Sequence, residues 1–186
     1  SKHPKYQQLS LTQPIRYNSG DPLEHSINRL LALDSQYIES PHFFHNAVQF
    51  IELSPHQLSH NEQLLAQTFA LLVIAHYQTS VNDFRQLLDS PSQRLFAIAH
   101  DEHIVGVCLV NLEGGLDDTI QQQISCGHRR PQGHLLAQQL FHVQGQTPFL
   151  SAKCARIVRI AIAPHLQNKK LGSQLLQFVE QTLEHT

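Results

Sequence analysis

The sequence predicts an α/β domain in which helices flank a mixed central sheet, and three observations support this fold class. Apolar segments with the period of a strand alternate along the chain with segments that have the period of a helix. Two apolar strands at 94–99 and 104–112 are joined by the polar run 100–103, which is typical of an antiparallel hairpin. A third apolar strand at 157–162 leads through a polar turn into a helix.

The N-terminal segment is predicted to be a polar linker. Residues 1–20 are polar with one strand-like piece at 14–17, so we expect a linker or the stub of an upstream domain, followed by one domain from 21 to 186. Asp21 is suited to cap a helix that begins at Pro22, because proline is favoured at the first helical position.

One strand and two helices are predicted next. Apolar and polar residues alternate at 47–53, which indicates a strand. The polar stretch after it has the composition of a loop, in which Ser59 and Glu62 have the spacing of a capping box. Helical periodicity predicts helices at 62–77 and 81–88, directly before the hairpin.

A long polar insertion is predicted between the hairpin and the last strand. It spans 114–133 and contains a short helix at about 118–124, and a further helix follows at 134–143. Gly106, inside the second hairpin strand, indicates a β-bulge or the close approach of another group to the backbone.

The domain is organised around the stretch from Arg156 to Ser173. Residues 157–162 are mostly β-branched and apolar, which predicts a strand buried on both faces, and Pro164 ends its pairing. A polar turn with one glycine precedes the helical sequence LLQFVEQTL, so free backbone N–H groups are expected at the helix start. Such a helix start favours the binding of phosphate.

The composition narrows the class of protein. With 41% hydrophobic and 15% charged residues the chain is globular, and a formal net charge of -2 argues against a uniformly basic nucleic-acid binder. Three distant cysteines without a C-x-x-C pair indicate a reducing compartment, and no apolar run is long enough for a membrane span, so we expect a cytoplasmic protein without membrane contact. The pairs His42/His45 and His56/His60 lack a further ligand at the usual spacing, so no metal site is predicted.

The turn after the last strand resembles the acetyl-coenzyme A motif of the GCN5-related N-acetyltransferase (GNAT) superfamily. That motif is Gln-x-x-Gly-x-Gly/Ala, and QNKKLG matches it with Gln167 and Gly172, while Lys170 replaces the first glycine. Lys170 keeps the backbone N–H but adds bulk and a positive charge. The resemblance implies that acetyl-CoA pairs through its pantetheine arm with Ile160, Ala161 and Ile162. It implies phosphate contacts with Gln167, Asn168, Lys169, Lys170, Leu171, Gly172 and Ser173.

Longer strings resemble one subfamily, the bacterial tRNA(Met) cytidine acetyltransferases. They are IRYNSGDPLEHSINRLLALD, LLVIAHYQTSVNDFRQLLDSP and GHRRPQGHLLAQQL, in the order of the subfamily. The resemblance implies acetylation of N4 of the wobble cytidine of elongator tRNA(Met). It also implies ATP or GTP hydrolysis by an upstream helicase-like domain of the same polypeptide, and no phosphate-binding loop G-x-x-x-x-G-K-[ST] occurs here. The GNAT fold normally continues past the last helix, so we expect its C-terminal strands to be missing.

His76 and Tyr77 are the expected contacts with cytidine. They follow an apolar helix where this fold borders its acceptor site, and the subfamily has an HY pair at the same point. A histidine near neutral pKa is able to accept the N4 proton, and a tyrosine is able to stack on the base. The alternative is that His76 caps the helix and Tyr77 fills the core.

His128, Arg129 and Arg130 form the compact basic cluster of the insertion, which suits phosphate contacts with RNA. A solvated surface is the alternative. A second group of cations, Arg156, Arg159, Lys169 and Lys170, in part suits coenzyme A phosphates.

Two other functions stay open at the level of the sequence. One is a stand-alone acetyltransferase that acts on a protein or a small-molecule amine and needs no RNA. The other is a non-catalytic module that binds RNA or a neighbouring domain, in which Lys170 blocks the cofactor loop.

Overall fold

The computed structural model describes residues 20–23, 47–74 and 81–184, without the side chains of 81–84. The chain divides into two compact units, 1–34 and 35–186. In the first unit the backbone N–H of Leu23 donates to Asp21 Oδ1 at 2.8 Å, which confirms the capping role of Asp21. The predicted strand-like piece at 14–17 lies outside the described residues, and the domain boundary after residue 20 stays a prediction.

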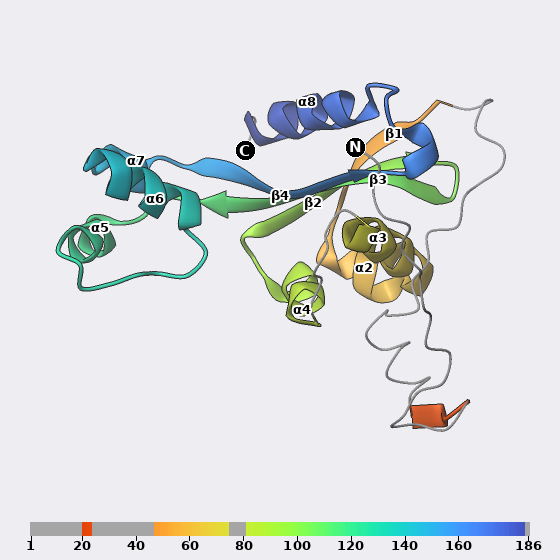
Figure 1. The fold of residues 1–186 in the computed structure, drawn as a ribbon, viewed down its shortest axis with the longest axis horizontal. Coiled ribbons are helices and arrows are strands. Elements are labelled where there is room, and N and C mark those ends of the chain that lie inside the picture. The colour runs from red at the N-terminus through yellow and green to blue at the C-terminus, as the bar shows by residue number, and fades with distance from the viewer. Residues whose placement is uncertain (1–19, 24–46, 75–80, 185–186) are drawn as a thin grey trace, which may run out of the picture. The chain divides into compact units, whose positions relative to one another are not determined.

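The second unit contains a four-stranded sheet in the order β1-β2-β3-β4 (Figure 1). The strands are β1 (Gln49–Leu53), β2 (Gln93–His100), β3 (His103–Glu113) and β4 (Cys154–Ile162). All three pairings are antiparallel, so the predicted hairpin is confirmed, whereas the mixed sheet is not found among the described residues. A parallel pair needs a crossover connection between neighbouring strands, and each of these neighbours runs back along the one before it.

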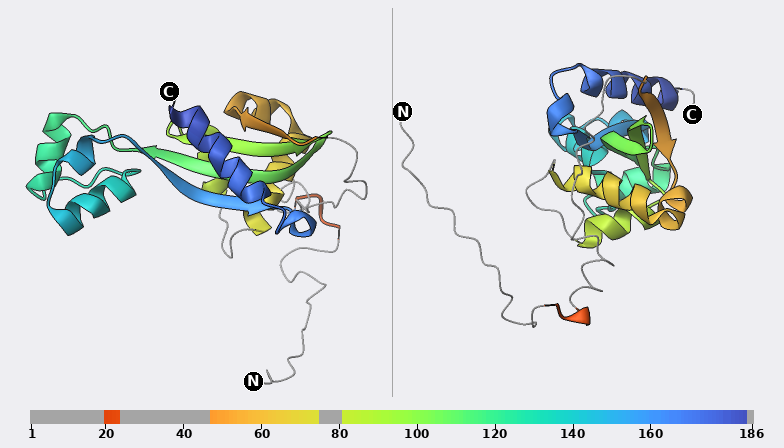
Figure 2. Two further views of the ribbon diagram at one scale, coloured as in Figure 1. Left: turned by 90° about the horizontal axis from the view of Figure 1, so that it is seen from above. Right: turned by 90° about the vertical axis from the view of Figure 1, so that its right-hand side faces the viewer.

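Helices cover both faces of this sheet (Figures 1 and 2). On one side lie α2 (Pro55–His60), α3 (Glu62–Ile74) and α4 (Val81–Asp89), and on the other α8 (Leu171–Glu184) crosses the strands obliquely. The ring of Phe178 from α8 meets Phe96 of β2 edge-on, with 6.1 Å between centroids, while Phe69 of α3 is buried on the opposite side. The central strands β2 and β3 are therefore buried on both faces.

The stretch after β1 is a helix and not the predicted loop. α2 begins with a complete capping box in which Ser54 Oγ accepts from the N–H of Gln57 and Gln57 Oε1 accepts from the N–H of Ser54. Ser59 lies inside this helix, and its hydroxyl donates to the carbonyl of His56. Asn61, whose Oδ1 accepts from Leu64 N–H at 3.0 Å, caps α3 in its place. The predicted pair Ser59 and Glu62 was therefore the wrong capping box.

Gly106 provides the close approach that its position predicts. A β-carbon there would lie 2.7 Å from Ile162 Cδ1 on β4 and 2.9 Å from Ile98 Cδ1 on β2. The register between β2 and β3 also shifts beside it, between Ile98 and Ala99, which is the predicted β-bulge. Gly106 thus lets three strands come together where β4 ends.

A helical arm, defined as residues 114–153, joins the ends of β3 and β4 (Figure 1). It contains α5 (Asp118–Ser125), α6 (Leu135–Gln144) and the unpredicted short α7 (Pro148–Ser151). Asp117 caps α5 by accepting from Ile120 N–H at 2.8 Å. The arm has a small core of its own, formed by Leu116, Ile120, Ile124, Ala137, Phe141 and Leu150. The helices predicted in and after the insertion are confirmed.

Candidate active site and RNA-binding surface

The predicted cofactor strand is the edge of the described sheet. β4 pairs with β3 up to the register pair Ile162 and Gly106, and one more backbone bond joins Ala163 N–H to Val105 O at 2.9 Å. The short helix η1 (Pro164–Leu166) then ends the pairing, as the proline predicts. Within the described sheet β4 pairs with β3 alone. Most of its residues are half-buried or exposed, with Ile157 45% exposed, so the strand is not buried on both faces as predicted. None of the described strands pairs with the other edge of Ile160–Ile162.

The predicted phosphate-binding residues form one continuous turn at the start of α8. Gln167 bends back and donates from Nε2 to Ile162 O at 3.3 Å, which ties the loop to the end of β4. The first hydrogen bond of α8 runs from Gln174 N–H to Lys170 O. Residues 171–173 thus form the first helical turn, whose N–H groups have no intrahelical acceptor. The structure brings together all ten residues predicted to hold acetyl-CoA.

Lys170 stands where the backbone itself favours glycine. Its φ is +62° and that of Asn168 is +64°, both in the left-handed region. Lys170 adopts the conformation that a glycine would take, with its side chain exposed. Gly172, by contrast, has ordinary backbone angles, and a β-carbon there would make only van der Waals contact with Ile162 at 3.7 Å. The substitution at 170 thus leaves the turn in place and brings a cation to it.

The predicted acceptor residues His76 and Tyr77 lie outside the described residues, just beyond the end of α3 at Ile74. Their roles as proton acceptor and stacking partner stay predictions.

The predicted RNA-binding cluster lies in the connection between α5 and α6. Gly127, with φ of +73°, ends α5 in a Schellman motif, in which its N–H bonds to Ile124 O and that of His128 to Gln123 O. His128, Arg129 and Arg130 follow directly, and all three are exposed. Cations at a helix C-terminus are favoured by its partial negative charge. The basic cluster thus lies at the surface of the arm, and the Schellman motif fixes the backbone where the cluster begins.

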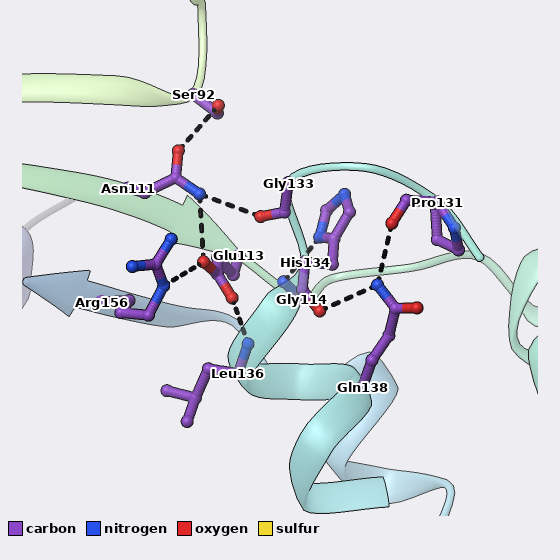
Figure 3. Close-up of polar contacts among 10 residues, drawn as sticks. All are labelled: Ser92, Asn111, Glu113, Gly114, Pro131, Gly133, His134, Leu136, Gln138 and Arg156. Atoms are coloured by element: carbon purple, nitrogen blue, oxygen red, sulfur yellow. Dashed lines mark hydrogen bonds and ion pairs between the residues drawn. The ribbon is translucent and has the colours of Figure 1, made fainter. Parts of the chain in front are cut away.

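A buried polar network at the base of the arm was not predicted (Figure 3). The fully buried Glu113 carboxylate accepts from Arg156 Nε at 2.6 Å, from Leu136 N–H at 2.6 Å and from Asn111 Nδ2 at 3.1 Å. Asn111 also donates to Gly133 O at 2.9 Å. Arg156 is therefore the partner of a buried carboxylate and not part of an open cationic surface, which corrects its predicted place in the second basic group.

One sequence signal does point to this network. Asn111 and Glu113 are two residues apart in an otherwise apolar strand, so their side chains lie on one face of the sheet. Arg156 is the register partner of Asn111 on β4.

The environment of Glu113 favours its charged form. Burial opposes ionisation, but hydrogen bonds from Arg156, Asn111 and the N–H of Leu136 together outweigh burial and lower its pKa. Burial also raises the pKa of the Cys108 thiol to about 11 and, together with the charge of Glu113, raises that of Cys154. A thiol held in its neutral form is a poor nucleophile, so neither cysteine is suited to covalent catalysis.

An open groove of about 750 Å³ lies between the second half of α8 and the first half of β4. Apolar side chains such as Ile157, Leu176 and Leu183 line it beside Glu113 and Lys153. It is at the opposite end of β4 from the cofactor turn. Within the described ranges no helix is long and apolar enough to cross a membrane, and no three potential metal ligands gather there.

The fold, with a strand, a polar turn and a helix in this order, is the one expected of a GNAT-type acetyltransferase, and a family model matches the chain. The model described as GNAT acetyltransferase 2 matches residues 67–186, so the chain belongs to this family. A second model, the helicase domain of RNA cytidine acetyltransferase NAT10/TcmA, matches residues 1–34, which is the first compact unit.

Curated relatives carry a more specific name. The chain is 37% identical over 174 residues to the tRNA(Met) cytidine acetyltransferase TmcA of Nitrosococcus halophilus, covering 92% of the chain and 23% of the relative. It is 39% identical to that of Vibrio cholerae, covering 94% and 25%, and 36% identical to that of Haloferax volcanii, covering 89% and 22%. The chain thus spans about a quarter of the length of these relatives. The predicted resemblance is confirmed.

Proposed function

We propose that this chain is the acetyltransferase module of a larger enzyme that transfers acetyl from acetyl-CoA to N4 of the wobble cytidine of elongator tRNA(Met). The observation that carries the proposal is the order of the two family matches, with helicase-domain sequence at 1–34 and the GNAT match at 67–186 after it. A stand-alone amine acetyltransferase has no reason to carry such sequence. Hydrolysis of ATP or GTP belongs in this proposal to the upstream domain.

The donor half of the site would use backbone groups. The open edge of β4 at 160–162 is suited to pair with the amides of pantetheine, and the N–H groups at 171–173 to receive the pyrophosphate. Lys170 and Lys169 place positive charge beside the same turn. Acetyl-CoA would supply the activated thioester that is the acetyl donor.

The acceptor half would use His76 and Tyr77. The N4 nitrogen attacks the thioester carbonyl carbon, the carbon–sulfur bond breaks, and coenzyme A leaves as a thiolate. His76 accepts the proton lost by N4, while Tyr77 stacks on the base or donates to it. Because the lone pair of N4 is delocalised into the ring, both orientation and a proton acceptor are needed.

The proposal is tested first on the cofactor. Isothermal titration of the chain with acetyl-CoA should give saturable heat, and no heat at millimolar acetyl-CoA would favour a non-catalytic module in its place. In the full-length enzyme, His76→Ala should abolish formation of N4-acetylcytidine, measured by mass spectrometry of digested tRNA, and leave acetyl-CoA affinity unchanged. Unchanged turnover would rule out the proton-acceptor role.

The acceptor is tested with matched RNAs. The full-length enzyme with acetyl-CoA and ATP should acetylate a tRNA(Met) transcript and not the same transcript with uridine at the wobble position. Acetylation of a simple amine at a similar rate without RNA would support the small-molecule alternative. Charge reversal at Arg129 and Arg130 should weaken tRNA binding, because these exposed cations are placed to contact phosphates.

A further inference from the structure

The basic cluster 128–130 lies on the helical arm, which the chain enters from β3 and leaves into β4. These two connections alone would hold the arm only loosely against the sheet. The stem of the arm has two backbone bonds, Gly115 N–H to Ala152 O at 3.3 Å and Leu116 N–H to Leu150 O at 3.1 Å. Two chain segments joined by so few backbone bonds are weakly constrained and are able to bend and twist. A third attachment is needed to fix the direction of the arm.

That third attachment is the buried network at the start of α6. Two bonds join β3 to residues 133–136: Leu136 N–H donates to Glu113 Oε2, and Asn111 Nδ2 donates to Gly133 O. Within the arm, Gly114 N–H donates to His134 Nδ1 directly after β3. Figure 3 shows these bonds. Their partners Gly133, His134 and Leu136 follow the basic cluster by only a few residues in the sequence. The Schellman motif at Gly127 holds the other end of the cluster.

We propose that Glu113 is a positioning residue for RNA binding: from the end of β3 its carboxylate fixes the start of α6 and thereby the place of Arg129 and Arg130 relative to the sheet. The proposal rests on the proposed function, in which these arginines contact the phosphates of tRNA. Glu113 touches neither RNA nor acetyl-CoA in it, and acts through the arm.

The chemistry of the network favours positioning over stability. A buried ion pair contributes little net stability, because desolvation of both charges offsets their attraction, and apolar residues of similar volume often serve as well. The charged carboxylate instead fixes the orientation of the elements around it. A carboxylate with three donors at 2.6 to 3.1 Å accepts only one arrangement of β3, β4 and α6. The Glu113 carboxylate bonds to residues of all three elements, Asn111 of β3, Arg156 of β4 and Leu136 of α6.

The test compares two carboxylates that pair with arginine. Glu113→Asp keeps the charge beside Arg156, so the ion pair does not lose a partner, but it is one methylene shorter and loses its reach to Leu136 N–H. Glu52→Gln is the control, since Glu52 on β1 binds Arg94 of β2 at 2.6 Å and lies on a different strand from the residues that bond to the start of α6. Both variants, and Arg129→Ala/Arg130→Ala, are made in the full-length enzyme, and tRNA(Met) binding is measured at fixed salt.

Glu113→Asp should raise the Kd for tRNA about tenfold, the effect of losing one charge-assisted hydrogen bond that orients the cluster. It should change kcat at saturating tRNA less than twofold. In the Arg129→Ala/Arg130→Ala background the same change should raise Kd no further, and Glu52→Gln should leave Kd as it is. An additional rise in that background, or a lowered melting temperature with unchanged Kd, would overturn the proposal.

The two proposals fail in different ways. If Arg129→Ala/Arg130→Ala leaves tRNA affinity unchanged, the cluster does not bind RNA and both proposals about it are wrong. If that double change weakens binding while Glu113→Asp does not, the RNA site stands and the positioning role alone is wrong.

Discussion

Gly114, the first residue of the helical arm, should be the glycine that least tolerates a side chain. Its φ is +80°, and a β-carbon would lie 1.8 Å from Ala152 O, which must move to at least 3.4 Å for ordinary contact. That shift breaks the bond from Gly115 N–H to Ala152 O and displaces the stem toward the small core of the arm. Gly145, with φ of +67° and nothing within 4 Å, offers the same backbone conformation without the clash.

The loss of unfolding free energy in each alanine variant can be estimated from these two sites. An L-residue at left-handed φ costs roughly 1–2 kcal/mol, and the lower entropy of the unfolded chain returns about 0.4–1 kcal/mol, so Gly145→Ala should cost about 1 kcal/mol. Gly114→Ala adds about 1 kcal/mol for the lost backbone bond and a similar amount for displaced packing, about 3 kcal/mol in all.

Thermal unfolding followed by circular dichroism measures the difference. At about 2–4 °C per kcal/mol for a chain of this size, Gly114→Ala should lower Tm by roughly 6–12 °C and Gly145→Ala by roughly 2–4 °C. Hydrogen exchange should place the loss in the arm, with Leu116 N–H exposed in Gly114→Ala only. Equal Tm values for the two variants would refute the account of the stem.

Two further predictions follow from the site. Because the pKa of Glu113 is lower in the folded chain than its ordinary 4.5, its stabilising contribution is present above that pH and is lost as the pH falls through the folded value. When urea unfolding is measured as the pH is lowered from above 4.5, the free energy of unfolding should therefore fall less for Glu113→Gln than for the wild type. Arg156, Cys154 and His134 are other ionisable groups near Glu113. Lys170→Gly should raise Tm by about 2 °C, because the relief of left-handed backbone strain exceeds the entropy cost of glycine. Lys169→Gly, the control, should lower Tm. The reverse order of Tm values would contradict the backbone strain at Lys170.

The sequence was sufficient for the elements whose signal is local. Hydrophobic periodicity placed α3, α4, α5, α6, α8 and the hairpin, because side-chain spacing decides which face of an element is buried. It failed after β1, where Pro55 and polar residues suggested a loop. The box Ser54-x-x-Gln57 has the same form as Ser59-x-x-Glu62, and only the packing of Leu58 into the core decides between them.

The ten residues expected to hold acetyl-CoA lie close together because they form two short stretches that are neighbours in the sequence, at the end of β4 and the start of α8. Their contacts with acetyl-CoA stay a prediction. At the base of the arm, the spacing of Asn111 and Glu113 places both on one face of β3 but does not show what they bind. Arg156 and Glu113 are 43 residues apart, and two such charges in a sequence favour two solvated side chains. Only the pairing of β3 with β4, and the packing of α6 against them, buries the Glu113 carboxylate and places the half-buried Arg156 beside it as its partner.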